Sequence, residues 1–157
     1  MKKAMKSLAV IFVAAATLVL SGCTKDAEDL IIGTWKAVSN TTTISGHPDA
    51  SMNTSHTETF PANVTLQLTF NKDKTGTVYE SFGNHSESSD FTYSVADDIL
   101  YITTEDGDLE GLASKLTIES VDKKELTISN TYKTWDEYDG EEFEYNEKMT
   151  IVLNKIK

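Results

Sequence analysis

The chain has 157 residues and is acidic, with a formal net charge of −11 at pH 7 and a sequence pI of about 4.6. All 14 basic residues are lysines, so the chain lacks the planar, bidentate guanidinium fork that suits phosphates and base edges. Charge and composition therefore argue against nucleic acid as a partner.

The first 22 residues have the layout of an export signal. Lysines lead, an apolar segment follows over residues 8–20, and small residues end it at 21–23. The apolar segment is shorter than the roughly 18–20 residues that a permanent membrane-spanning helix needs. We therefore expect residues 1–22 to be removed. Their removal would take away three lysines and no acid, so the formal charge would change from −11 to −14.

The junction at the end of this segment carries the only cysteine of the chain. Leu20, Ser21, Gly22 and Cys23 resemble the lipobox of bacterial lipoproteins, and an ordinary signal peptide with an unrelated cysteine is the alternative. The resemblance implies diacylation of Cys23, cleavage before it and acylation of the new amino terminus. Two or three acyl chains anchor a domain durably, since each buried methylene contributes roughly 0.8 kcal/mol. Acylation would leave the mature chain no free thiol for a disulfide, a metal or catalysis.

The residues after Cys23 bear on location. Thr24 stands where many lipoproteins retained at the inner membrane have aspartate, so the outer membrane is expected, on its periplasmic face or at the cell surface. The acidic run over residues 25–29 resembles the surface-export signal of Bacteroidetes lipoproteins. A charged, solvated tether without a sorting role would have the same composition. We expect residues 23–30 to be a lipidated tether with room for one helical turn, and residues 31–157 to be one domain.

From residue 33 onward the chain alternates apolar and polar residues with a period of two, as half-buried strands do. The clearest stretches are 64–70, 78–82, 91–95, 100–102, 116–118, 126–128 and 149–153. Polar turns separate them, at 71–76, 96–98 and 122–124. With the segment around Trp35 this gives about eight strands and no convincing helix. The pattern predicts an all-β fold, an antiparallel up-and-down β-barrel or alternatively a β-sandwich.

Gly33 and Trp35 favour the barrel. They resemble the Gly-x-Trp signature of lipocalins and of the lipocalin-like domains of Bacteroidetes lipoproteins. The glycine would permit a tight turn into the barrel floor, and the tryptophan would plug the closed end. The resemblance covers most of residues 30–155 by pattern and implies a lipocalin-like (calycin) barrel with room for one small ligand. No arginine stands near the carboxyl end to stack on Trp35, and Lys155 or Lys157 would replace it only in part.

The last two strands are predicted to form a long hairpin. Asp139-Gly140 is a type I′ turn signal, and a two-residue loop there pairs Ile128 with Ile151 and Leu126 with Leu153. Residues 135–144 then form its projecting tip. The tip is rich in acids and also aromatic, and the aromatic residues would either contact a sugar or a partner or pair across the hairpin: Trp135, Tyr138, Phe143 and Tyr145.

Metal and catalytic sites are weakly indicated. The acidic tip (Asp136, Glu137, Asp139, Glu141, Glu142, Glu144) and residues 105–108 have carboxylates for calcium, but not the spacing of a calcium loop. His47, His56 and His85 lie in polar segments, and a zinc site would need three or four converging ligands. No Gly-x-Ser-x-Gly elbow, phosphate loop or dinucleotide fingerprint occurs. We expect no cofactor, no metal and no catalytic residues, with a hydrolase at the barrel mouth as the least favoured alternative.

Two functions follow from the barrel. The first is a membrane-anchored, non-enzymatic binding domain for a small, mostly apolar ligand, with residues 40–61 as a loop that lids the mouth. The expected ligand cavity is lined by inward-facing residues of several strands: Leu66, Leu68, Phe70, Phe91, Tyr93, Leu100, Ile102, Leu116, Ile128 and Ile151. The alternative is a surface interaction module with a filled barrel, which contacts an envelope protein or glycan through the acidic tip or the long loop. An empty apolar cavity would favour the first function, and a packed interior the second.

Overall fold

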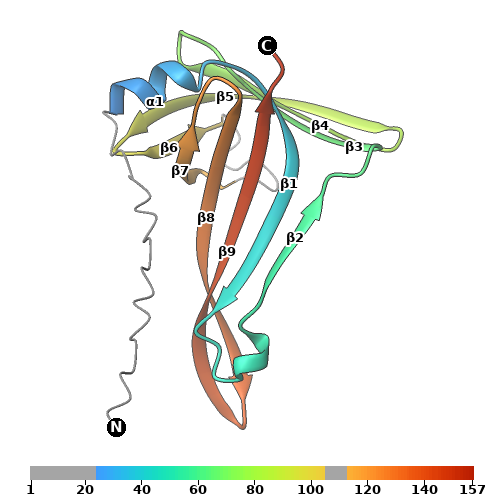
Figure 1. Ribbon diagram of the computed structural model, residues 1–157, viewed down its shortest axis with the longest axis vertical. Helices are drawn as coiled ribbons and strands as arrows, with labels where there is room; N and C mark the ends of the chain where they lie inside the picture. Colours follow the sequence, from blue (N-terminus) through green and yellow to red (C-terminus); the bar gives the residue numbers. More distant parts are fainter. Residues whose placement is uncertain (1–23, 105–112) are drawn as a thin grey trace, which may run out of the picture.

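The computed structural model describes residues 24–104 and 113–157, in which strands joined by turns follow one short α-helix (Figure 1). The elements are α1 (Thr24–Leu30), β1 (Gly33–Ser45), a 3-10 turn η1 (Ala50–Met52), β2 (Ser55–Thr59), β3 (Val64–Phe70), β4 (Thr75–Phe82), β5 (His85–Ala96), β6 (Ile99–Thr103), β7 (Lys115–Val121), β8 (Glu125–Tyr138) and β9 (Glu141–Lys155).

Eight of these strands close an antiparallel barrel. The strands follow the order β2-β1-β3-β4-β5-β6-β7-β8-β9, and a further pairing of β1 with β9 closes the sheet on itself. Strand β2 lies outside the barrel, on the edge of β1. The predicted eight-stranded up-and-down barrel is confirmed, and the β-sandwich alternative does not apply because one continuous sheet returns to its first strand.

The barrel opens at one end into two arms because β1 leaves β3 early. Strand β1 pairs with β3 only from Gly33 to Lys36, and after an irregularity at Ala37/Ser39 it continues along β9 to Ser45. Strand β2 takes the place of β3 beside it. The outer parts of β1, β2, β8 and β9 form the long arm, which points downward in Figure 1, and the outer parts of β3, β4 and β5 form the short arm, which points to the right.

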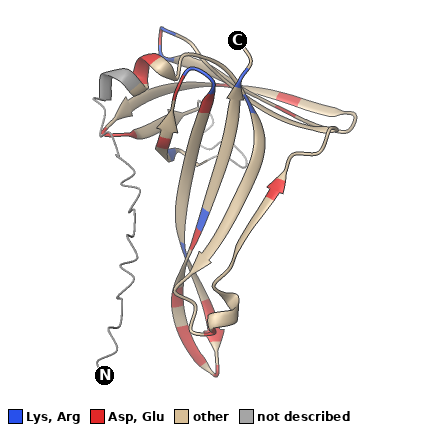
Figure 2. Cartoon of the chain, viewed as in Figure 1, with Lys and Arg blue, Asp and Glu red and all other residues tan. Residues whose placement is uncertain are grey.

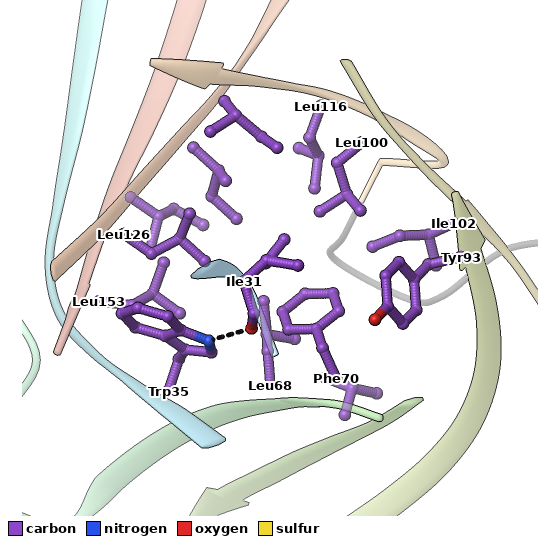
Figure 3. Close-up of a cluster of buried hydrophobic side chains, with 14 of the residues drawn as sticks. Ile31, Trp35, Leu68, Phe70, Tyr93, Leu100, Ile102, Leu116, Leu126 and Leu153 are labelled. Atoms are coloured by element: carbon purple, nitrogen blue, oxygen red, sulfur yellow. Dashed lines mark hydrogen bonds between the residues drawn. The ribbon is translucent and has the colours of Figure 1, made fainter. Parts of the chain in front are cut away.

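The core fills the closed end of the barrel. Seven side chains there are at most 1% exposed and come from five different strands: Trp35, Leu68, Phe70, Leu100, Leu126, Ile128 and Leu153. All of them except Ile128 are labelled in Figure 3, where they surround Ile31, the residue after α1, which is itself fully buried. Because apolar residues contributed by strands distant in the sequence meet here, the hydrophobic effect stabilises closure of the whole sheet.

Helix α1 belongs to this core. Residues 23–30 were expected to be a tether, yet α1 spans Thr24–Leu30 and Ala27 is 8% exposed. The apolar residues Ala27 and Ile31 are four positions apart, a spacing that places both on one side of a helical turn. The described part of the expected tether is therefore packed against the barrel floor.

The predicted register of the last hairpin is confirmed. Ile128 pairs with Ile151 and Leu126 with Leu153. Asp139 and Gly140 have φ values of 56° and 82°, as a two-residue type I′ turn requires. Segment 135–144 is the tip of the long arm (Figure 1).

The expectation of a lid over residues 40–61 is wrong. Most of this segment is strand, because β1 continues to Ser45 and pairs with β2 from Ser39 to Thr43. β-branched threonines favour the extended chain. Their hydroxyls also bond across the pair, Thr41 to Thr57 at 2.8 Å and Thr43 to Ser55 at 3.0 Å. The segment extends the wall of the long arm.

Candidate functional site

The closed end of the barrel is built around Trp35. Its indole Nε1 donates a 2.6 Å hydrogen bond to the Ile31 carbonyl (Figure 3). Lys155 Nζ lies 4.8 Å from the centroid of the Trp35 ring and donates to the carbonyls of Ile32 at 2.6 Å and Leu30 at 3.3 Å. A lysine thus supplies the cation over the tryptophan face, where the sequence lacks an arginine. It also satisfies carbonyls at the carboxyl end of α1.

The close approach of Lys155 and Lys157 to residue 33 requires a glycine there. A Cβ atom at this position would lie 2.5 Å from Lys155 Cε and 2.5 Å from the Lys157 carbonyl oxygen, and the glycine φ is +133°. The sequence suggested that Gly33 permits a tight turn. The structure adds a second reason, which is the close passage of the carboxyl-terminal strand over the glycine backbone.

A second group of polar contacts fastens α1 to the barrel. Glu28 of α1 forms an ion pair with Lys74, whose Nζ lies 5.5 Å from the Tyr93 ring centroid. The Tyr93 hydroxyl donates to the Asn71 carbonyl at 2.7 Å. Burial, and then the negative charges of Glu28 and Asp73, raise the pKa of Tyr93 above its ordinary value. This end of the molecule is a closed structural floor.

The expected ligand cavity is occupied by its own side chains. Nine of its ten residues are 0–7% exposed and belong to the packed core: Leu68, Phe70, Phe91, Tyr93, Leu100, Ile102, Leu116, Ile128 and Ile151. Phe70, Phe91 and Tyr93 are in edge-to-face contact, with ring centroids 5.0–6.4 Å apart. Among the described residues, these nine fill the barrel interior, and only Leu66 is left to line an open site.

That open site is a groove of about 410 Å³ at the barrel mouth, on the short arm. Its apolar lining is Phe60, Val64, Leu66 and Phe82. Val64 pairs with Phe82 across β3 and β4, and Leu66 is two residues from Val64, so these three side chains share one face of the sheet. Phe82 is 69% exposed at the rim, while Phe60 and Leu66 pack against the core. The volume lies within the range of small-molecule sites, roughly 300–1,000 Å³.

The polar lining of the groove is acidic. Glu80 pairs with Leu66 on one side and with Glu87 on the other, so the two carboxylates lie on the same face as the apolar residues. His85 lies opposite Phe82, and the remaining lining residues are Thr65, Ser81 and Ser86. Among the described residues, no lysine lines this groove.

Three aromatic residues at the tip of the long arm pack around His47. The His47 ring lies edge-on to Phe143, Tyr145 and Tyr138, with centroid distances of 4.6, 5.7 and 5.9 Å. This contact holds the β1–β2 turn against the hairpin tip, so these three aromatics serve the fold. Trp135 is not part of the cluster and is 66% exposed.

The carboxylates of the tip are spread along both of its strands (Figure 2). In the part of the chain that the structure describes, no three His, Cys, Asp or Glu side chains gather as a metal site would require. This finding applies to the acidic tip and to His47, His56 and His85. The candidate calcium-binding residues at 105–108 lie outside the described residues. His56 is close to Glu58, with 3.2 Å between Nε2 and Oε1, and both are largely exposed.

The expected membrane anchor precedes the first described residue, Thr24. The expected export signal at 1–22 and the lipobox-like residues Leu20, Ser21, Gly22 and Cys23 lie outside the described residues. Neither helix of the described ranges is long and apolar enough to cross a membrane.

A closed eight-stranded antiparallel barrel with a Gly-x-Trp floor and an open mouth defines a lipocalin-like protein. A family model described as a lipocalin-like domain matches residues 31–128, more than half of the chain, and the chain belongs to this family. No curated protein and no solved structure matches it significantly. The matched stretch ends at Ile128, inside β8, so most of the long hairpin lies beyond it.

Sequence reasoning missed most of the groove. Of its lining, only Leu66 was among the expected cavity residues, and Phe60, Glu80, Phe82 and Glu87 were not. The period-2 pattern of β4 does put Phe82 on the same face as the buried Val78, which was an available signal. What the pattern could not show is that β1 leaves β3 after Lys36 and so opens the groove.

Proposed function

We propose that this protein is a lipid-anchored, non-enzymatic binding domain of the cell envelope that takes a small, mostly apolar ligand in the groove at the barrel mouth. One observation carries the proposal: the groove has an apolar lining of Phe60, Val64, Leu66 and Phe82, at the open end of a barrel in which the described inward-facing residues of the closed end form a packed core. Burial of apolar ligand surface, at about 25 cal/mol per Å², would provide the affinity.

A binding titration tests the groove. The neutral dye N-phenyl-1-naphthylamine, which fluoresces in apolar surroundings, is titrated into the purified chain. We expect Phe82→Ser to weaken dye binding about tenfold, because it removes most of an aromatic wall worth roughly 1.5 kcal/mol or more. Tyr101→Ser is the matched control, since Tyr101 is also an exposed strand aromatic, 41% exposed, and does not line the groove. Equal effects of both variants, or no dye binding, would contradict the proposal.

The membrane anchor is part of the proposal and rests on the resemblance of residues 20–23 to a lipobox. Helix α1 begins at Thr24, so an acylated Cys23 would join it directly. Mass spectrometry of the chain purified from membranes should show a mature protein that begins at Cys23 and carries acyl chains. Cys23→Ser should move the protein from the membrane to the soluble fraction. An unmodified cysteine on a membrane-free protein would refute the anchor and leave the groove proposal standing.

A second candidate function is contact with an envelope glycan or protein through the long arm, with Trp135 as the supporting observation. At 66% exposed, this is an unusually accessible tryptophan on the tip. The other tryptophan, Trp35, is fully buried, so acrylamide quenching of fluorescence reports on Trp135. Protection from acrylamide by purified envelope polysaccharide would support this function. Unchanged quenching, together with dye binding in the groove, would leave the first function alone.

A further inference from the structure

Strand β2 presents a free backbone edge. Among the described strands it stands first in the order of the sheet and pairs only with β1, and all of its residues are exposed. Its register with β1 has no irregularity, and the strand contains neither lysine nor proline. Lysines, prolines and bulges are common devices that keep an edge strand from pairing with another chain. The edge of β2 is therefore open to a further strand.

The hydrogen bonds between β2 and β1 determine which backbone groups point to this edge. The amide of Phe60 donates to the Val38 carbonyl at 3.1 Å. At the other end of the strand, the amide of Ile44 donates to the Thr54 carbonyl at 2.8 Å. Because alternate residues of an antiparallel strand bond to opposite sides, the even-numbered residues bond to β1. The odd-numbered residues of β2 turn their N–H and C=O groups to the open edge: Ser55, Thr57 and Thr59.

The sequence of β2 is self-complementary about its central residue, Thr57. When two copies of the strand pair antiparallel with Thr57 opposite Thr57, Ser55 of each copy lies opposite Thr59 of the other. These are the residues whose backbone groups point outward, so each such pair can exchange both of its N–H···O=C bonds. In the same register, His56 of each copy lies opposite Glu58 of the other.

Charge specifies this register. His56 and Glu58 share one face of β2 and already contact each other within one copy, with 3.2 Å between Nε2 and Oε1. In the paired strands, histidine and glutamate would alternate along each strand and across the interface. A shift of the register by two residues would instead place His56 opposite His56, or Glu58 opposite Glu58. Opposite charges at directly opposed positions stabilise a sheet and like charges destabilise it.

We propose that two copies of this protein associate through β2, antiparallel and about a two-fold axis at Thr57. The second strand is assigned to another copy of this chain because the backbone edge and the charge pattern of β2 complement themselves, as a two-fold interface requires. The pairing would join β1 and β2 of both long arms into one continuous sheet. This inference goes beyond the proposed function and does not depend on the ligand groove.

Sedimentation equilibrium of the purified chain tests for the dimer. Since the contact is short, we expect a weak dimer with a Kd on the order of 100 μM. Amide exchange at low and high protein concentration tests the interface. The amides of Ser55, Thr57 and Thr59 should gain protection with concentration, whereas those of His56 and Glu58 should be protected in both cases. A monomeric chain at all concentrations would overturn the proposal and leave the edge to a strand of another protein or to no partner.

Thr57→Pro should block the edge. It removes an N–H group that points outward, a position where an edge strand accepts proline, and should raise the Kd about tenfold or more. Thr57 also shares a 2.8 Å hydroxyl hydrogen bond with Thr41. Thr41→Val is therefore the matched control, since it loses that bond, keeps the edge and should dimerise like the parent chain. Protected amides of His56 and Glu58 verify that β2 stays on β1. Equal Kd values for the parent chain and both variants would overturn the proposal.

Charge variants test the register. His56→Glu makes both positions acidic and Glu58→Lys makes both basic, so each variant alone should dimerise about tenfold more weakly than the parent chain. In an equimolar mixture, opposite charges face each other again, and the Kd should return to within about threefold of the parent value. Addition of Thr57→Pro to both variants should remove this recovery. A mixture that associates no better than the separate variants would overturn the proposal.

Discussion

Lys155 lies over the indole ring of Trp35, with its Nζ 4.8 Å from the ring centroid. The two residues belong to the last and first strands of the barrel, which pair at this point. A single side chain therefore covers the floor tryptophan and, through its bonds to the Leu30 and Ile32 carbonyls, also fixes the segment between α1 and β1.

Replacement of Lys155 should weaken the barrel floor. Lys155→Met keeps an unbranched side chain but loses the cation and its hydrogen bonds, and we expect the free energy of unfolding to fall by about 1–2 kcal/mol. Lys155→Arg should retain most of the stability, because a guanidinium also stacks on indole. Urea unfolding provides the measurement. Lys133→Met is the control, since it breaks only the exposed pair with Glu144 and should cost less than about 1 kcal/mol.

Gly76 should not tolerate a side chain. A Cβ there would lie 2.2 Å from the Phe91 ring and 2.5 Å from the Thr69 carbonyl oxygen, so Gly76→Ala should cost about 1–3 kcal/mol through overpacking. A double-mutant cycle with Phe91→Leu tests the cause. If the clash with the ring dominates, the double variant should be more stable than the sum of the single effects predicts. Strict additivity would assign the cost to the backbone contact.

Stability should depend on pH through Glu119. Hydrogen bonds from Lys148 Nζ and Ser129 Oγ, each 2.6 Å long, lower the pKa of the Glu119 carboxyl below its ordinary 4.5. A folded-state pKa below the unfolded value adds stability above the unfolded pKa, and this is lost as the pH falls through the folded one. Glu119→Gln should therefore destabilise the protein at neutral pH, by at most about 1 kcal/mol because the pair is partly exposed. In urea unfolding, the difference from the parent should shrink below about pH 4.5; a constant difference would exclude the ionised carboxylate as its source.

His47 should control the order of the β1–β2 turn. Its ring contacts Phe143, Tyr145 and Tyr138, so His47→Ala should release residues 46–53 from the hairpin tip. We expect faster proteolysis and faster amide exchange in that turn, with little effect on the barrel core. His85→Ala, at the other arm, is the control and should leave this turn protected. Unchanged cleavage of the turn would mean that its backbone bonds suffice.

The sequence predicted the barrel well because its strands carry local signals. Alternation marks which residues face inward, and the Asp139-Gly140 turn fixes the register that pairs Ile128 with Ile151. Both signals are encoded within a few residues. The short helix α1 was less evident, since seven residues give little periodicity and its stability comes from the burial of Ala27.

The position of the groove was not predictable in the same way. It exists because β1 exchanges its neighbour β3 for β2 after Lys36, and no single segment encodes which strand pairs with which. The threonine-rich residues 40–43 read equally well as a polar loop, and only their pairing with β9 and β2 makes them a wall of the long arm. Alternation predicts that Phe70 and Phe91 point inward. It does not predict that their rings pack against each other and fill the interior.

The pairing of β1 with β9 has a consequence for how the protein folds. The Ile32 carbonyl and the Lys155 ammonium group that meet at the floor are 123 residues apart, so the barrel cannot close locally. Such a high contact order slows folding, since a long loop must be closed before its contacts add stability. Until β9 docks, the unpaired edge of β1 is open to strands of other chains. The time between synthesis and closure is thus the period in which this protein is most exposed to aggregation.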